Sequence, residues 1–314
     1  MSRFWQSASE EPSHIEMAAV VSVSGLTWHA GHVTVSGEQV PLRVHVLLGA
    51  VPAMACVSVL ARGGSFAETF LTFVATGPLL FGTVLVHEIG HLVQAARRGA
   101  TPVEILLWPL GGLAITANSS SDPTDRIAIS ASGPSTHVPM ALVWLIIASF
   151  AKSASTFFYA LATYTLWLNV YMCAFNLLVP CFPLDCSQIL CSYMILRGKS
   201  PMDTARLITA ISVPFVAVLL FWGAWTFVAT GSGALTVFLA VWMAHQTYNL
   251  AMAAKEGNLT DHPLFRNPPR APDPSPPPAT FSPMVHHVVG NECACGFEPS
   301  VVLATLASCA ACAM

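Results

Sequence analysis

Charged residues are scarce in this 314-residue chain. Asp, Glu, Lys and Arg make up 9% of it, whereas a soluble domain carries about 25%. Hydrophobic residues make up 54%, so an ordinary soluble domain is excluded. The chain also lacks a basic stripe, a phosphate-binding glycine loop and a heptad array, so no nucleic-acid partner is expected. Five of the nine cysteines lie in or next to apolar runs, which argues against a secreted disulfide framework.

What the chain has instead is long apolar runs. A bilayer-spanning helix needs roughly 20 apolar residues, and six runs approach that length. We therefore predict an all-α polytopic membrane protein with about six transmembrane helices in a lipid bilayer. The expected spans are about 42–61, 69–94, 128–150, 157–180, 207–229 and 232–253.

Basic residues indicate the orientation of these spans. Of the 13 Lys and Arg residues, only Arg62 and Lys152 follow the first and third spans, and the other eleven fall on the opposite side. Cytoplasmic loops carry the excess of Lys and Arg. Both termini are therefore expected in the cytoplasm, as for a multi-pass integral membrane protein of undetermined organelle.

The sequence His87-Glu88-Ile89-Gly90-His91 lies at the end of an uncharged run, 69–86. Positions four apart share one face of a helix, so His87 and His91 can hold one zinc ion. Glu88 beside them can accept a proton from an activated water.

Acidic residues are equally rare within the apolar runs. Of the 16 Asp and Glu residues, only Glu88 and Asp185 lie well inside them. No Lys or Arg lies deep inside a predicted span as a partner, since Arg43 is at the very start of the first one, and an ionisable group at membrane depth is a functional candidate. A catalytic zinc commonly has three protein ligands, which makes Asp185 the candidate third ligand.

Asp185 follows a stretch where the fourth span must break. Pro180 and Pro183 prevent a regular helix there, and irregular backbone at depth is tolerated only where protein or a water-filled cavity covers it. His87 precedes Arg97 by ten residues, about 15 Å along a helix. Asp185 also lies near the inner end of its span, so the two motifs are expected at similar depth.

At this point the chain resembles the site-2 protease family of intramembrane zinc metalloproteases, peptidase family M50. The resemblance covers about residues 41–195 and rests on five pieces in one order. These are Arg43-Val44-His45, the His87–His91 motif, Trp108-Pro-Leu-Gly111-Gly112, Ser132-Gly133-Pro134, and the segment from Asn176 to Asp185.

The resemblance implies a fold, a cofactor and a set of roles. One Zn²⁺ per chain would be held by His87, His91 and Asp185, with Glu88 as the general base and Asn176 as an oxyanion donor. The reaction would be peptide-bond hydrolysis in or near a transmembrane segment of a membrane-anchored substrate, as in regulated intramembrane proteolysis. A regulatory membrane protein is a further partner that such enzymes can have.

The chain departs from the family pattern at three positions. Cys186 replaces the glycine after the zinc aspartate, and could be an extra ligand, an inhibitory contact or a small buried residue. Val179 lengthens the spacing between Asn176 and Asp185 by one residue. His137 stands where many relatives carry Asn, and we interpret it as a packing or interfacial histidine.

Short β-like elements flank the helices. The loop after the zinc helix, with Gly111 and Gly112, could offer an edge strand to an extended substrate or form a plain turn. Residues 32–40 alternate as in a small hairpin. We expect three parts: an N-terminal cytoplasmic segment 1–40, a membrane core 41–257, and a cytoplasmic tail 258–314 that is Pro-rich, then contains cysteines, and is mostly disordered.

Two other classes remain open at this stage. A zinc-binding membrane protein or transporter should carry several acidic or histidine residues along its spans, whereas the ionisable residues here converge on one point. A non-proteolytic relative acting as a membrane chaperone is disfavoured by an intact Glu88, although Cys186 keeps it open.

Overall fold

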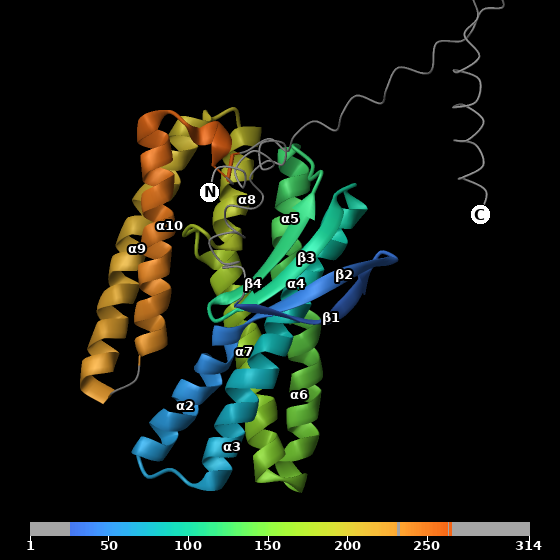
Figure 1. Cartoon of the computed structure of the whole chain (residues 1–314), viewed down its shortest axis with the longest axis vertical. Helices are drawn as coiled ribbons and strands as arrows, with labels where there is room; N and C mark the ends of the chain where they lie inside the picture. The colour runs from blue at the N-terminus through green and yellow to red at the C-terminus, as the bar shows by residue number, and fades with distance from the viewer. Residues whose placement is uncertain (1–25, 231–232, 263, 266–314) are drawn as a thin grey trace, which may run out of the picture. The chain divides into compact units, whose positions relative to one another are not determined.

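Helices dominate the part of the chain that the computed structural model describes, which is residues 26–230, 233–262 and 264–265 (Figure 1). A small sheet is the other component. The helices are α2 (Ala50–Ala61), α3 (Phe66–Val74), α4 (Leu80–Arg97), α5 (Pro123–Ser135), α6 (His137–Ala154), α7 (Thr156–Leu178), α8 (Asp185–Leu196), α9 (Pro201–Thr230) and α10 (Ala234–Glu256). The strands are β1 (Thr27–Val35), β2 (Glu38–His45), β3 (Thr101–Trp108) and β4 (Gly111–Ala117).

Four helical segments of the described residues are long and apolar enough to cross a membrane. They are Phe66–Arg97, Pro123–Ala154, Thr156–Leu178 and Pro201–Thr230. Large apolar side chains on them face outward, among them Phe150, Phe221 and Val228. Exposed apolar surface on this scale is unfavourable in water and is expected where lipid is the solvent.

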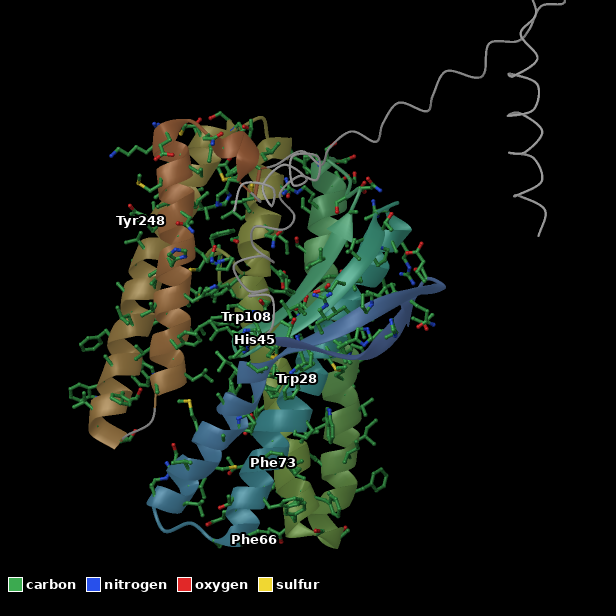
Figure 2. All side chains as sticks on the ribbon, in the orientation of Figure 1. Trp28, His45, Phe66, Phe73, Trp108 and Tyr248 are labelled. Atoms are coloured by element: carbon green, nitrogen blue, oxygen red, sulfur yellow. The ribbon has the colours of Figure 1, made fainter. Side chains whose placement is uncertain are left out.

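The first predicted span, 42–61, is wrong in its extent. Residues up to His45 form β2, and the apolar helical stretch that follows, Val46–Ala61, is shorter than a span. Hydropathy along the sequence does not distinguish an apolar strand from the apolar helix that directly follows it, so the two were predicted as one span. The sixth expected span corresponds to α10, which pairs with α9 as an antiparallel hairpin (orange in Figure 1). Its second half carries a run of polar side chains from His245 to Asn249, of which Tyr248 points outward (Figure 2).

The four strands form one sheet in the order β1-β2-β3-β4. The β1–β2 hairpin confirms the predicted one, and its two turn residues, Ser36 and Gly37, both have positive φ, as a type I′ turn requires. The strand β2 runs across the predicted boundary at residue 40 and pairs in parallel with β3. Among the strands of the described residues, β4 pairs with β3 alone and therefore lies at the edge of the sheet.

The break after the fourth predicted span is confirmed. The helix α7 ends at Leu178, residues 179–184 are irregular, and α8 begins at Asp185. This stretch is covered by protein, since Cys181 and Phe182 are buried and the backbone N–H of Phe182 donates to the Ser212 hydroxyl of α9 at 2.9 Å. The loop can therefore remain non-helical without leaving polar backbone exposed to lipid.

The C-terminal end of the described chain packs onto the core. After α10, Leu264 and Phe265 are buried in a cluster with Phe182 and Cys191, and Arg126 of α5 donates to the carbonyl of Leu264 at 2.9 Å. The predicted features of the tail beyond residue 265, its Pro-rich linker and its cysteines, lie outside the described residues.

Candidate metal centre

Three potential metal ligands meet between α4 and the start of α8. The ligand atoms of His87, His91 and Asp185 all lie within 4.8 Å of one another. The two Nε2 atoms are 3.0 Å apart, and the carboxylate oxygens of Asp185 lie 3.2 Å from the Nε2 of His87 and 3.4 Å from that of His91. The structure thus brings together the three residues that the sequence pattern selected.

The outer ring nitrogens leave both Nε2 atoms free for a metal. The Nδ1 of His91 lies 2.8 Å from the carbonyl oxygen of Ile129, so it must be the protonated donor. The Nδ1 of His87 lies 3.0 Å from the Nε2 of His137, a buried side chain on α6. In each neutral ring whose Nδ1 is the donor, the Nε2 lone pair faces the other two ligands.

This donor set fits a zinc ion. Two imidazole lone pairs and a carboxylate face one another, and Asp185 Oδ2 accepts no hydrogen bond of acceptable geometry, so a bound metal cation would offset their mutual repulsion. Two His and one carboxylate are ligands that Zn²⁺ takes in catalytic sites. A Cβ added at Gly133 would collide with His91 and lie 2.8 Å from the Nε2 of His87. Glycine therefore keeps open the space beside both ring nitrogens.

Close helix packing holds this site together. A Cβ at Gly90 would lie 2.6 Å from Thr136 and 2.9 Å from the carbonyl oxygen of Ser132. Gly90 is thus the residue that lets α4 approach α5, the helix that carries Ile129 and Gly133. The same Cβ at Gly90 would lie 3.2 Å from the Cα of Gly133. The glycine of the His87–His91 motif therefore faces the glycine of Ser132-Gly133-Pro134.

Glu88 is buried on the side of α4 that faces β4. A Cβ at Gly112 would lie 2.8 Å from its carboxyl carbon and from Oε1, and the backbone of Ala114 also interacts with the carboxylate. Gly112 and Ala114 are two apart and so share one face of the strand. The edge strand therefore contacts the candidate general base directly.

The other predicted site residues have these positions. Asn176 lies in the last turn of α7, and its Nδ2 donates to the Met172 carbonyl at 3.0 Å. Gly111 opens β4, so the glycine pair forms a strand rather than a plain turn. Cys186 is partly buried and is not one of the three clustered ligands. His45 has a structural contact, because its Nδ1 accepts the N–H of Leu47 at the start of the next helical turn.

Two residues near the site were not expected from the sequence as part of it. His137 contacts the ring of His87, and Asn169 contacts His137 at 2.9 Å. The available signal was polarity: both side chains occur in helices that are otherwise apolar, and buried polar groups in a membrane are costly unless they are bonded.

Residues 77–153 match the model of peptidase family M50. A zinc metalloprotease, MJ0392, of Methanocaldococcus jannaschii is 30% identical over 145 residues, which cover 46% of this chain and 41% of that protein. A putative zinc metalloprotease, Rip3, of Mycobacterium tuberculosis is 25% identical over 184 residues, 57% of this chain and 44% of that protein.

The matched part thus spans less than half the length of these two curated relatives. A solved structure of the site-2 protease from Methanocaldococcus jannaschii is also similar, with 20% identity and a TM-score of 0.47, over 74% of this chain and 95% of that one. Both curated relatives are named as zinc metalloproteases, and the apolar helices of the described residues imply an integral membrane protein. The chain is thus similar to peptidase family M50 over residues 77–153 and to two proteins named as zinc metalloproteases.

Proposed function

We propose that this chain is an intramembrane zinc metalloprotease that hydrolyses peptide bonds in or near transmembrane segments of membrane-anchored proteins. The observation that carries the proposal is the cluster of His87, His91 and Asp185 with Glu88 beside it. The two histidines and Glu88 lie on a helical segment, Phe66–Arg97, that is long and apolar enough to span the membrane. The ionisable residues converge on one point instead of lining a path, which favours catalysis over ion transport.

The chemistry divides between the metal and the protein. When bound, zinc supplies a Lewis acid that makes water a nucleophile near neutral pH. Glu88 accepts the proton of that water and returns it to the leaving amine. Burial between α4 and β4 restricts the Glu88 side chain to this position and keeps bulk water away from its carboxylate.

We propose further that the substrate binds along β4 through its Gly111–Ala117 backbone. A helical substrate must unwind before hydrolysis, because its carbonyl groups are hydrogen-bonded and shielded by side chains. An edge strand offers unpaired N–H and C=O groups to such an extended segment. The contact of Gly112 and Ala114 with Glu88 would bring the scissile peptide bond next to the general base.

Gly112→Ala tests this arrangement. The added methyl group would collide with Glu88, so we expect cleavage to fall by about 100-fold, the scale on which a displaced catalytic group loses rate. Zinc content should not change. Gly82→Ala on the same helix as Glu88 is the matched control, because a Cβ there meets nothing within 4 Å. Equal activity of both variants would show that β4 does not position the base.

The sidedness that the basic residues indicate is a second proposal, with both termini in the cytoplasm and six membrane crossings, of which the short Val46–Ala61 stretch would be the first. It places Lys152, at the end of α6, outside and Lys255, at the end of α10, inside; both side chains are exposed. We expect a membrane-impermeant maleimide to label Lys152→Cys in intact cells, and Lys255→Cys only after the cells are opened. Each signal is measured against the unsubstituted chain, and the reverse order would invert the topology.

Cleavage of a purified single-pass membrane protein tests the proposed activity. The full chain is reconstituted with the substrate in vesicles, and Glu88→Gln is the inactive control. Zinc-dependent appearance of two fragments supports the proposal. Zinc flux across the vesicles without fragments would support the transporter alternative instead.

A further inference from the structure

A line of buried polar side chains leads away from His87 through two neighbouring helices. The Nδ1 of His87 on α4 lies 3.0 Å from the Nε2 of His137 on α6, and the Nδ1 of His137 lies 2.9 Å from the Oδ1 of Asn169 on α7. The Nδ2 of Asn169 lies 2.8 Å from the carbonyl oxygen of Thr165. His137, Asn169 and Thr165 are each 0% exposed.

The direction of every hydrogen bond follows from the last one. A backbone carbonyl only accepts, so the group of Asn169 that faces Thr165 is the amide nitrogen, and its carbonyl oxygen faces His137. The Nδ1 of His137 must therefore donate. In the neutral ring the Nε2 of His137 then has a lone pair, and the Nδ1 of His87 is the donor to it. The Nε2 of His87 is left without a proton, facing His91 and Asp185.

The two histidine ligands are supported differently. The Nδ1 of His91 donates to the backbone carbonyl of Ile129, which no side-chain substitution removes. His87 depends on the side chain of His137, and so on the helices α6 and α7. In metal sites the partner of the outer ring nitrogen fixes the tautomer and the ring orientation of the ligand.

We propose that His137 is a positioning residue for the metal site: held by Asn169, it fixes the ring of His87 in the tautomer whose Nε2 lone pair faces the metal. The inference rests on the proposed zinc site and extends it to three helices, with α6 and α7 supporting a ligand that α4 carries. It also accounts for a histidine buried in an apolar helix, where a polar group without a hydrogen-bond partner is costly.

Two substitutions at position 137 separate this role from simple packing. Gln and Leu are close to His in volume, but only Gln carries an acceptor near the place of the Nε2. In the purified full-length chain, we expect His137→Leu to weaken zinc binding by about 10- to 100-fold, the range seen when such partners are lost. His137→Gln should bind zinc within about threefold of the wild type, since the hydrogen bond to His87 is kept. Affinity is measured by competition with a chromophoric chelator at one pH.

A packing role predicts a different pattern. If His137 only fills space, the loss of zinc affinity in each variant would parallel its loss of fold stability. Fold stability is measured separately, as the thermal unfolding temperature in excess chelator. Thr165→Val is the matched control, because its hydroxyl donates to the carbonyl of Leu161 and takes no part in the line. Its zinc affinity should be unchanged.

If His137→Leu does not fold, Asn169→Leu decides the question together with His137→Gln. Asn169→Leu frees the Nδ1 of His137 and should lower zinc affinity by an amount between those of the two His137 variants. Wild-type affinity in His137→Leu, or in Asn169→Leu where His137→Leu does not fold, overturns the positioning role. Absence of zinc binding in the wild-type chain would instead overturn the proposed function, so the two failures are distinguishable.

Discussion

Replacing Glu88 by Gln is expected to abolish proteolysis while leaving zinc bound. Gln has the shape of Glu but no basic oxygen, so no side chain beside the metal ligands would accept the proton of the attacking water. A general base contributes about 10²–10⁴-fold to rate, and cleavage should fall at least that far. Glu88 is not one of the three clustered ligands, so elemental analysis of the purified variant should find the wild-type zinc content.

Asn176→Ala provides a graded comparison for the same assay. We propose that Asn176 stabilises the oxyanion, for which its amide must turn away from the carbonyl of Met172 that it now bonds. Loss of one oxyanion donor costs about 10²–10³-fold in kcat, so Asn176→Ala should retain measurable cleavage. Full activity of Glu88→Gln would contradict the mechanism. If the variant is inactive, membrane proteins that accumulate with it in cells are candidate substrates.

The candidate ligands of this site could be selected from the sequence because their signals are local or conspicuous. His87 and His91 are four residues apart on one helix, and that spacing alone places them on one face. Asp185 lies 94 residues after His91 and has no such link. It was identifiable because a carboxylate in an apolar stretch, next to two prolines, has few explanations other than function. The extra residue, Val179, has an extended backbone directly after the end of α7, and Asp185 still reaches both histidines.

The support of the site could not be predicted in the same way. The hydrogen bond between His87 and His137 joins residues 50 apart, and the pattern of either helix by itself says nothing about the other. The sheet shows the same difficulty. The β1–β2 hairpin has a local turn signal, but the parallel pairing of β2 with β3 joins Leu42 to Ile105. The first span was predicted too early in the chain for a related reason. The strand β2 directly precedes a helical stretch in the sequence, and the hydropathy of the two forms one continuous run.

Asp185→Asn is expected to remove zinc from the protein. The substitution takes away the only negative charge among the three ligands and weakens the oxygen as a donor. The amide nitrogen of Asn could also donate to a histidine Nε2, which would satisfy a lone pair without a cation and so stabilise the metal-free state. Zinc affinity should therefore fall further than the about 10- to 100-fold expected when only a supporting partner is lost.

The neighbouring cysteine is the matched control for that experiment. Cys186→Ser keeps the side-chain volume but replaces the thiol, the only group at this position that could be an additional ligand. Because Cys186 lies outside the ligand cluster, this variant should keep the wild-type zinc content, measured by elemental analysis of both proteins after identical purification. Zinc loss in Cys186→Ser together with zinc retention in Asp185→Asn would show that the third ligand is the Cys186 thiol and not the Asp185 carboxylate. Loss in Asp185→Asn alone would assign the aspartate, and the start of α8 would then be part of the zinc site.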